Sequence, residues 1–339
     1  MKTPRLLLPC ILLFGAASSL CAAQTYKVKD LGTLSGGDFS VAEAVNATGQ
    51  VTGASGASNL ADIFLYRHGT MTDLGTLGGN TGIGNGINAS GQIAGYSTDS
   101  AGNYRAFLAS GGKLTDIGDL GGGSAVAYAV NDSGQVVGSA VTSEGSNHPF
   151  LYSDGKMIDL GTLNSPPGNA FWNSATGINN SGVVTGMSWD AQGNLDAFIW
   201  RKGKMKKLGN LGRPWTEGRA INNKGQVTGI GTTKSDDAHL FISTPSGKLK
   251  DLGTIGGLGS APWGFGINDA GVIVGRFTYQ GSYHALRYSA GKIEDLNNLI
   301  PANSGWALEQ ATGINNAGQI TGTGMHNGLE HAFLLTPAQ

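Results

Sequence analysis

Apolar and polar residues alternate in short runs along most of the chain, and tight turns separate these runs. One run ends in Asn and a Gly turn, as in AVNATGQ at 44–50, and a second follows at once in QVTGAS at 50–55. A third (IFLYR, 63–67) and a fourth (MTDLG, 71–75) come after a polar loop and a second turn. Asn-x-x-Gly between apolar runs is typical of a hairpin turn. No stretch has the period of a helix, so the pattern predicts short antiparallel strands.

This set of four runs recurs along the chain. Its marker, the first residue of the DLG string, falls at Asp30, Asp73, Asp116, Asp159, Lys207, Asp251 and Asp295, with spacings of 43, 43, 43, 48, 44 and 44 residues. Four short strands per unit of this length are the signature of a propeller blade. The sequence therefore predicts an all-β, seven-bladed β-propeller with four antiparallel strands per blade. A β-solenoid is the alternative, but its coils are usually shorter, and an open stack would leave exposed edges.

The two ends of the chain are incomplete in complementary ways. The last unit finishes at HAFLLTPAQ without a fourth strand, and the segment YKVKDLG at 26–32 is a fourth strand with no third strand before it. We therefore predict that residues 26–32 pair with residues 332–336 and close the ring, giving 28 strands with adjacent termini.

Residues 1–23 have the layout of a secretory signal peptide. Lys2 and Arg5 precede an apolar run and small residues, with no acidic side chain, and we expect cleavage after Ala23. A membrane anchor is less favoured because the run is short and contains Pro9. The expected product is one exported domain, residues 24–339, located outside the cell, in the periplasm or at the cell surface.

Composition narrows the function further. Both cysteines lie in the leader, so the mature chain has no disulfide and no cysteine nucleophile. The chain has 22 Lys and Arg, two of them in the leader, against 23 Asp and Glu, so the mature net charge is −3. Without a basic run, binding to nucleic acid is not expected. No later stretch is apolar for long enough to insert into a membrane, and we expect a monomer.

The units resemble the HAF-repeat family of exported bacterial proteins. The resemblance rests on HAFLL at His331, DAFIW at Asp196, the DLGTL strings and the INxxGQ turns, and it covers residues 26–339. It implies export and a repeat fold. It implies no reaction, so no catalytic residue is carried over to this chain.

Seven copies within one chain also allow a comparison of positions in the first strand. The residue before the Asn is always Val or Ile, and the residues two and four before it are always Ala or Gly. The residue three before the Asn varies: it is Glu43, Asn85, Tyr128, Thr176, Arg219, Phe265 or Thr312. If the first strand is innermost, these side chains approach a central channel. Ordinary packing between blades is the equally weighted alternative.

Tryptophan is distributed unevenly along the repeats. Trp172, Trp215, Trp263 and Trp306 all lie between a DLG-type strand and the next Asn turn, in units four to seven. A Trp ring offers a flat apolar face and one N–H donor, which suits stacking on a sugar or gripping a peptide. We therefore predict a ligand-binding face. Its candidate residues are Trp172, Trp215, Glu217, Arg219, Trp263, Phe265, Trp306, Glu43 and Tyr128. The alternative is that the Trp rings seal the longer linkers onto the blades.

These observations favour an exported, non-catalytic module that binds a glycan or an extracellular protein. One alternative is a lyase or hydrolase acting on polysaccharide, with Glu43, Glu217 and Arg219 at the channel mouth, since acid–base chemistry needs such groups around one substrate. A structural surface protein is the third possibility. No ligand spacing typical of a metal site and no cofactor motif is present, so we predict neither a metal nor a cofactor.

Overall fold

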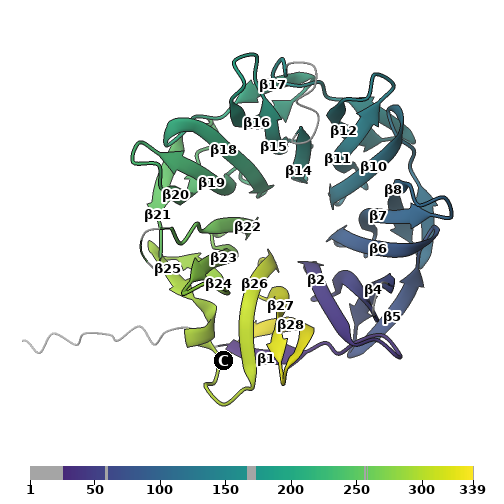
Figure 1. Ribbon diagram of the computed structural model, residues 1–339, viewed down its shortest axis with the longest axis vertical. Coiled ribbons are helices and arrows are strands. Elements are labelled where there is room, and N and C mark those ends of the chain that lie inside the picture. The colour runs from purple at the N-terminus through teal and green to yellow at the C-terminus, as the bar shows by residue number, and fades with distance from the viewer. Residues whose placement is uncertain (1–25, 58–59, 166–172, 256, 258, 339) are drawn as a thin grey trace, which may run out of the picture.

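The computed structural model describes residues 26–57, 60–165, 173–255, 257 and 259–338, and these form a ring of β-sheets around a central opening (Figure 1). The predicted leader lies outside the described residues. The strands that face the opening are β2 (Phe39–Val45), β6 (Gly78–Ile87), β10 (Gly121–Val130), β14 (Ser174–Ile178), β18 (Gly212–Ile221), β22 (Trp263–Ile267) and β26 (Trp306–Ile314). Each carries the first run of the sequence repeat.

Three further strands lie outside each innermost strand. The second strands are β3 (Val51–Ala57), β7 (Ile93–Asp99), β11 (Val136–Thr142), β15 (Val184–Trp189), β19 (Val227–Thr233), β23 (Ile273–Tyr279) and β27 (Ile320–His326). The third are β4 (Leu60–Arg67), β8 (Tyr104–Ser110), β12 (Asn147–Ser153), β16 (Leu195–Arg201), β20 (Ala238–Ser243), β24 (Ser282–Ser289) and β28 (Leu329–Pro337). The outer strands are β5 (Thr70–Gly75), β9 (Lys113–Asp116), β13 (Lys156–Asp159), β17 (Lys204–Lys207), β21 (Leu249–Gly253), β25 (Lys292–Asp295) and β1 (Tyr26–Asp30).

Hydrogen bonds join these strands into five sheets, of which three have four strands and two have eight. Each eight-stranded sheet contains two antiparallel groups of four, joined by one parallel pair: Ala61 with Thr81, or Leu195 with Trp215. We call each antiparallel group of four a blade. Among the described residues, the helical structure is one short 3-10 helix, η1 (Leu296–Leu299), and no helix is long and apolar enough to span a membrane.

The predicted pairing of the chain ends is confirmed. β1 pairs antiparallel with β28, with Tyr26 opposite Pro337 and Asp30 opposite Phe333, and Leu31 N–H donates to the Ala332 carbonyl at 3.0 Å. β1 is therefore the outer strand of the last blade. Figure 1 shows the purple β1 beside the yellow β28.

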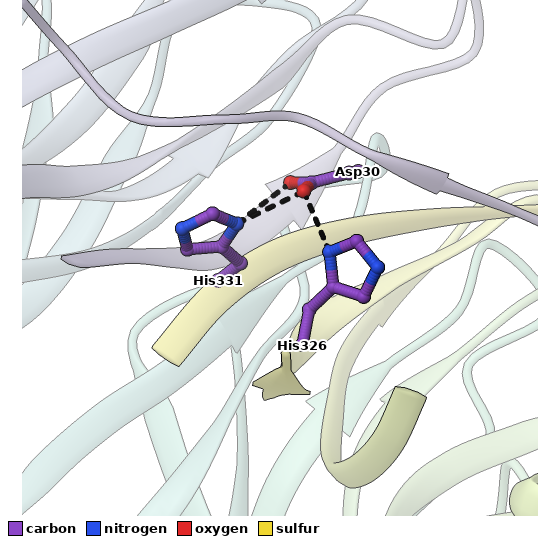
Figure 2. A group of neighbouring side chains, drawn as sticks. All are labelled: Asp30, His326 and His331. Carbon is purple, nitrogen blue, oxygen red and sulfur yellow. Dashed lines mark hydrogen bonds and ion pairs between the residues drawn. The ribbon is translucent and has the colours of Figure 1, made fainter. Parts of the chain in front are cut away.

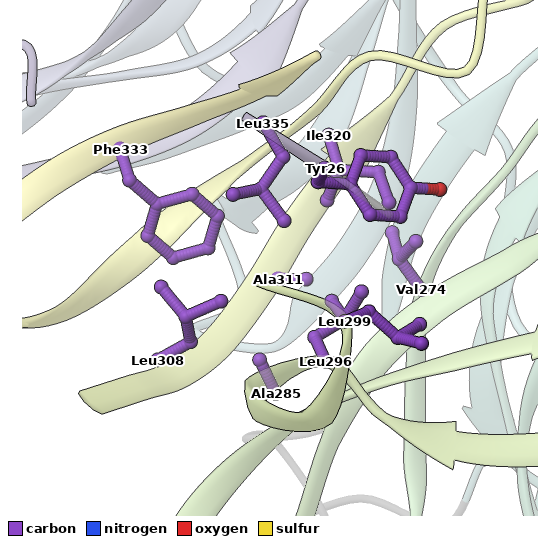
Figure 3. Close-up of a cluster of buried hydrophobic side chains, with 10 residues drawn as sticks. All are labelled: Tyr26, Val274, Ala285, Leu296, Leu299, Leu308, Ala311, Ile320, Phe333 and Leu335. Carbon is purple, nitrogen blue, oxygen red and sulfur yellow. The ribbon is translucent and has the colours of Figure 1, made fainter. Parts of the chain in front are cut away.

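The seam between the last two blades is packed with apolar side chains (Figure 3). Tyr26 of β1 lies in this cluster beside Val274 of β23 and Leu335 of β28, and Leu296 and Leu299 of η1 cover it from the neighbouring blade. The Tyr26 hydroxyl accepts a hydrogen bond of 3.1 Å from the buried guanidinium of Arg287. Burial of such side chains contributes about 1.5–3 kcal/mol each, so β1 is a structural part of the ring.

The HAF string has a simple explanation in the blade. Its third residue is fully buried in every copy: Phe64, Phe107, Phe150, Phe198, Phe241, Leu286 and Phe333 are all 0% exposed. Its first residue lies near the DLG residue of the outer strand. In most blades an acid meets a base there, but the first blade places Asp62 near Asp73, and burial together with this like charge raises the pKa of Asp62. His148 with Asp159, His239 with Asp251 and His284 with Asp295 are acid–base pairs, at 2.7–2.9 Å. The fourth blade reverses the charges, with Asp196 against Lys207 at 2.7 Å.

Candidate functional site

A β-bulge in every innermost strand positions the variable residue. The antiparallel register between the first and second strands shifts at Glu43, Asn85, Tyr128, Thr176, Arg219, Phe265 and Thr312, so each is the extra residue that its partner strand does not match. Bulges re-aim side chains and occur near functional sites. This explains why the position three before the Asn tolerates any residue type, because its side chain leaves the packed layer of the sheet.

An unvarying glycine of the second strand makes room opposite this bulge. The seven positions are Gly53, Gly95, Gly138, Gly186, Gly229, Gly275 and Gly322. A Cβ atom at any of them would lie 1.7–2.0 Å from a backbone oxygen of the first strand. No side chain can fit at that distance, so the close approach of the two backbones requires glycine here.

All seven bulge residues line one central cavity of about 780 Å³. Such a volume is typical of a small-molecule site. Three of the bulge side chains also bond the neighbouring blade: Asn85 donates to the Ala127 carbonyl at 2.7 Å, Thr176 to Gly218 at 2.8 Å and Thr312 to Ala42 at 2.7 Å. The sequence left open whether these residues approach the channel or pack between blades. The bulge residues do both, because all seven line the cavity and three of them also bond a neighbouring blade.

Most residues that line the cavity, 14 of 19, come from the second, third and fourth blades. There it is lined by Tyr96 of β7, Tyr104 at the start of β8 and Tyr128 of β10, together with Ser139 and Asn147. The rings of Tyr96 and Tyr104 meet edge to face at 5.4 Å. Tyr104 is 49% exposed and Tyr128 is 37% exposed. The accessible aromatic surface of the cavity is therefore formed by tyrosine.

Glu43 is the one acidic side chain among the described residues that line the cavity. It lies deep in the channel, and no hydrogen bond reaches it from the described residues. Burial raises the pKa of Glu43 to about 7, because a low-polarity environment disfavours the charged form. Its charge in turn contributes to the raised pKa of Tyr96, after burial and the neighbouring Tyr104 and Tyr128. Glu43 is thus positioned to exchange a proton near neutral pH.

Arg219 supplies the positive charge on the opposite part of the lining. Its guanidinium bonds the carboxylate of Glu217 and lies over the Trp263 ring, 4.9 Å from the ring centre. Glu217 is 1% exposed and is not part of the cavity lining. Burial raises the pKa of Glu217, against the opposing effect of Arg219. The enzymatic hypothesis grouped three residues. Glu43 and Arg219 line the cavity, whereas Glu217 lies outside the lining and forms an ion pair with Arg219.

Trp215, Trp263 and Trp306 are not among the residues that line the cavity. Trp263 packs against Phe265, 6.3 Å between ring centres, under Arg219. Trp306 stacks flat on His326, with ring centres 4.5 Å apart. Trp215 is partly buried in β18 beside the third strand of the preceding blade. Trp172 lies outside the described residues. A platform formed by these rings therefore stays a prediction, whereas Phe265, Tyr128, Glu43 and Arg219 share one site.

The repeated asparagines surround the other end of the channel, where they line a smaller cavity of about 280 Å³. Each buried Asn side chain donates to the backbone carbonyl of the corresponding Asn in the next blade, at 2.9–3.2 Å, and Asn315 returns the series to Asn46. The series runs through Asn46, Asn88, Asn131, Asn179, Asn222, Asn268 and Asn315. In each turn the same side chain accepts backbone N–H groups two and four residues on, as with Thr48 and Gln50 at Asn46. We call this series the Asn ring.

Sequence reasoning missed Tyr96 and Tyr104, and it recognised the Asn only as a turn residue. The tyrosines occur once each, in a second and a third strand, so no repeat comparison singles them out. The Asn ring had a signal: Asp or Ser would also serve in such a turn, yet all seven copies have Asn. Asn has an oxygen that accepts from its own turn and a separate NH₂ group that donates to the next blade, whereas Asp has no donor and Ser has a single atom for both tasks.

Known structures share the fold of this chain at low sequence identity. The β-propeller domain of the Trilobed protease from Pyrococcus furiosus, described as having an open velcro topology, has 11% identity and a TM-score of 0.57, over 88% of this chain and 94% of that one. A puromycin-hydrolyzing peptidase from Mycobacterium tuberculosis has 11% identity and a TM-score of 0.58, over 92% of this chain and 51% of that one. These matches show a β-propeller fold. No family model and no curated protein matches this chain.

Proposed function

We propose that this chain is an exported, non-catalytic binding module that holds a carbohydrate in its central cavity. The observation that carries the proposal is the ring of bulge residues. The fold restricts the positions on either side in the first strand to Ala or Gly and leaves the bulge position free, and that position lines the cavity in all seven blades. A position that varies while facing a cavity is available for recognition.

The chemistry of the lining favours a sugar. Tyr104 and Tyr128 present partly exposed rings, and Asn147, Ser139 and Glu43 add polar groups around them. Aromatic rings accept the apolar face of a sugar, and their hydroxyl groups bond its edge. An extracellular protein would need a projecting residue to reach the same groups, so it is the less favoured partner.

We also infer that the ring has seven blades and is monomeric, and that it belongs with the HAF repeats. The count follows if each eight-stranded sheet is divided at its single parallel pair. It agrees with the seven bonds of the Asn ring, which return to their starting blade.

The direct test is a glycan array with the purified protein, compared with Tyr128→Ala and Tyr104→Ala. We expect binding to one class of glycan and a loss of at least tenfold in affinity in both variants, since base or sugar stacking of this kind is worth about 1–3 kcal/mol. Tyr279→Ala is the matched control, because Tyr279 is 42% exposed and lies outside the cavity lining. Unchanged affinity in the cavity variants would overturn the proposal, and failure to bind any glycan would favour a protein partner.

Glu43 supports a second candidate, a lyase-type enzyme acting on polysaccharide. A pKa near 7 suits a general base at neutral pH. A hydrolase needs two carboxyl groups flanking the bond, and the described lining of the cavity provides one. Proton abstraction by Glu43 is therefore the better-supported reaction. Turnover of a bound glycan that disappears in Glu43→Gln, with binding retained, would establish this candidate, whereas equal turnover would exclude Glu43 as the base.

A further inference from the structure

Three potential metal ligands meet at the seam where the first strand of the chain joins the last two strands. Asp30 of β1 lies between His326 at the end of β27 and His331 of β28 (Figure 2). His326 Nδ1 is 2.9 Å from one carboxylate oxygen of Asp30, and His331 Nδ1 is 2.9 Å and 3.0 Å from the two oxygens. One ligand atom from each residue can be chosen so that all three lie within 4.8 Å of one another.

The repeats show that this cluster exceeds what the fold requires. His331 and Asp30 are the usual acid–base pair of the HAF and DLG positions, as in His239 with Asp251. His326 is additional. The corresponding residues at the end of the second strand in other blades include Ala57, Thr142 and Thr233, and none of them is a histidine.

The fourth blade shows what occupies this place when the residue types differ. There the corresponding three residues are Asp190, Asp196 and Lys207, and the ammonium group of Lys207 binds both carboxylates. A cation thus sits between ligand-type side chains at the same location of a blade. In the last blade the three residues are two imidazoles and one carboxylate, and the sequence supplies no cation among them.

We propose that Asp30, His326 and His331 bind a zinc ion that joins the two ends of the chain. Zinc takes nitrogen from imidazole and oxygen from carboxylate at about 2.0–2.2 Å, in a tetrahedron. Ligand atoms in such a tetrahedron lie roughly 3.3 Å apart, so the present spacings of 2.9–3.0 Å require only a small opening of the cluster. Water would complete the fourth position, since the three side chains are 15–31% exposed.

The surroundings hold the ligands for this role. Trp306 stacks on the His326 ring at an angle of 4° and fixes its plane. The side-chain amide of Asn327 lies 3.3 Å from His326 Nε2 and, with its oxygen turned to that atom, would accept its N–H when Nδ1 binds metal. Gly32 N–H donates to Asp30 at 2.8 Å.

The ligands are far apart in the sequence, so they do not form a metal-binding motif that could be recognised there. His326 and His331 are 296 and 301 residues from Asp30. A metal that links such distant positions closes a very long loop, and anything that binds only the folded chain stabilises it. The zinc would therefore reinforce the pairing of β1 with β28.

The test is zinc binding by the purified chain after treatment with EDTA, measured by titration calorimetry and by thermal unfolding. We expect one zinc per chain and a rise in Tm of about 5 °C or more at 100 times the Kd. The same protein with cobalt should show the visible absorption of a tetrahedral site. His326→Phe keeps a ring against Trp306 but removes the ligand nitrogen, so it should reduce zinc affinity at least tenfold.

His239→Ala is the matched control, because it removes a histidine from an acid–base pair that has no third ligand. We expect it to bind zinc as tightly as the unaltered chain. If the unaltered chain shows no saturable binding, or if His326→Phe binds zinc equally well, the proposal is wrong and the three side chains form only a hydrogen-bonded pair of histidines around Asp30.

Discussion

The two ends of the central channel are built by the same strands, yet they follow opposite rules. At one end the Asn ring has the same residue in every blade. At the other end lie the seven bulge residues, which we call the bulge ring, and these are of six different types. Only three positions of the chain separate the two rings in each blade, as with Glu43 and Asn46. The contrast therefore cannot come from the backbone alone.

The difference lies in how many partners each side chain must satisfy. Asn222 is buried, donates to Asn268 and accepts from Lys224 and Gln226, so every polar atom of its amide is used. Tyr128 is more than one-third exposed, and its side chain makes no hydrogen bond among the described residues. A residue with several buried bonds cannot change without leaving some of them unmade. The invariant ring serves the fold, whereas the variable ring has fewer such bonds to satisfy, in keeping with the recognition role proposed for it.

Removal of residues 26–32 is expected to have the largest effect on this arrangement. The deletion strips β28 of its outer partner, uncovers the cluster that contains Tyr26, and removes Leu31 from its cluster with Ala42 and Phe64 of the first blade. We expect a loss of at least about 5 kcal/mol, from two buried side chains and five ladder pairs. Urea unfolding measures it. A deletion variant that unfolds at the same urea concentration as the intact chain would contradict the role of β1.

A single substitution in the Asn ring should cost less but still be severe. Asn222→Ala removes the bond to the next blade and leaves two N–H groups of its own turn without an acceptor. The expected loss is about 2–3 kcal/mol, with ligand affinity unchanged. Lys224→Ala is the control, because this exposed side chain makes no hydrogen bond among the described residues, and it should cost under about 1 kcal/mol. Similar losses in both variants would mean that the Asn ring is not special.

The repeat comparison predicted the strands, the offset of the chain ends and the channel-facing position, because each of these leaves a mark in all seven copies. The large apolar third residue of HAF (Phe in six copies and Leu286 in one) and the glycine of the second strand recur for reasons of burial and close approach, and such a recurring residue is visible in the sequence. The antiparallel pairing of β1 and β28 followed from counting strands. These are properties of the unit, and the sequence repeats the unit.

The cavity itself was harder to predict because its residues come from different blades and from different strands. Tyr96, Tyr104 and Asn147 lie in second and third strands, where nothing in the sequence indicates that they reach the channel. The bulges were also missed, since strict alternation places residues two apart on one face. The repeat locates the tryptophans between the outer strand of one blade and the Asn turn of the next. It does not predict their neighbours, such as His326, which stacks on Trp306.

Glu43→Gln should sharpen the comparison by showing that the bulge ring can work against stability. The pKa of Glu43 is raised from 4.5 to about 7 in the folded chain, so the folded state holds a proton that the unfolded state loses. The stability of the unaltered protein therefore falls as pH rises from about 4.5 through 7. The variant should match it near pH 4 and exceed it by about 1–2 kcal/mol at pH 8, after allowance for solvent in the cavity. An equal difference at both pH values would show that Glu43 titrates normally.

Thr176→Val is the smallest change that still distinguishes the two rings. Thr176 is one of the three bulge residues that bond a neighbouring blade, through a hydrogen bond of 2.8 Å to the Gly218 carbonyl. Valine keeps the shape and removes the hydroxyl, so we expect a loss of about 0.5–1 kcal/mol in urea unfolding. Tyr128→Phe, which keeps the ring and breaks no bond between blades, should cost less. If Thr176→Val were as damaging as Asn222→Ala, the bulge ring would hold the blades together as firmly as the Asn ring does, and the freedom of its residues would need another explanation.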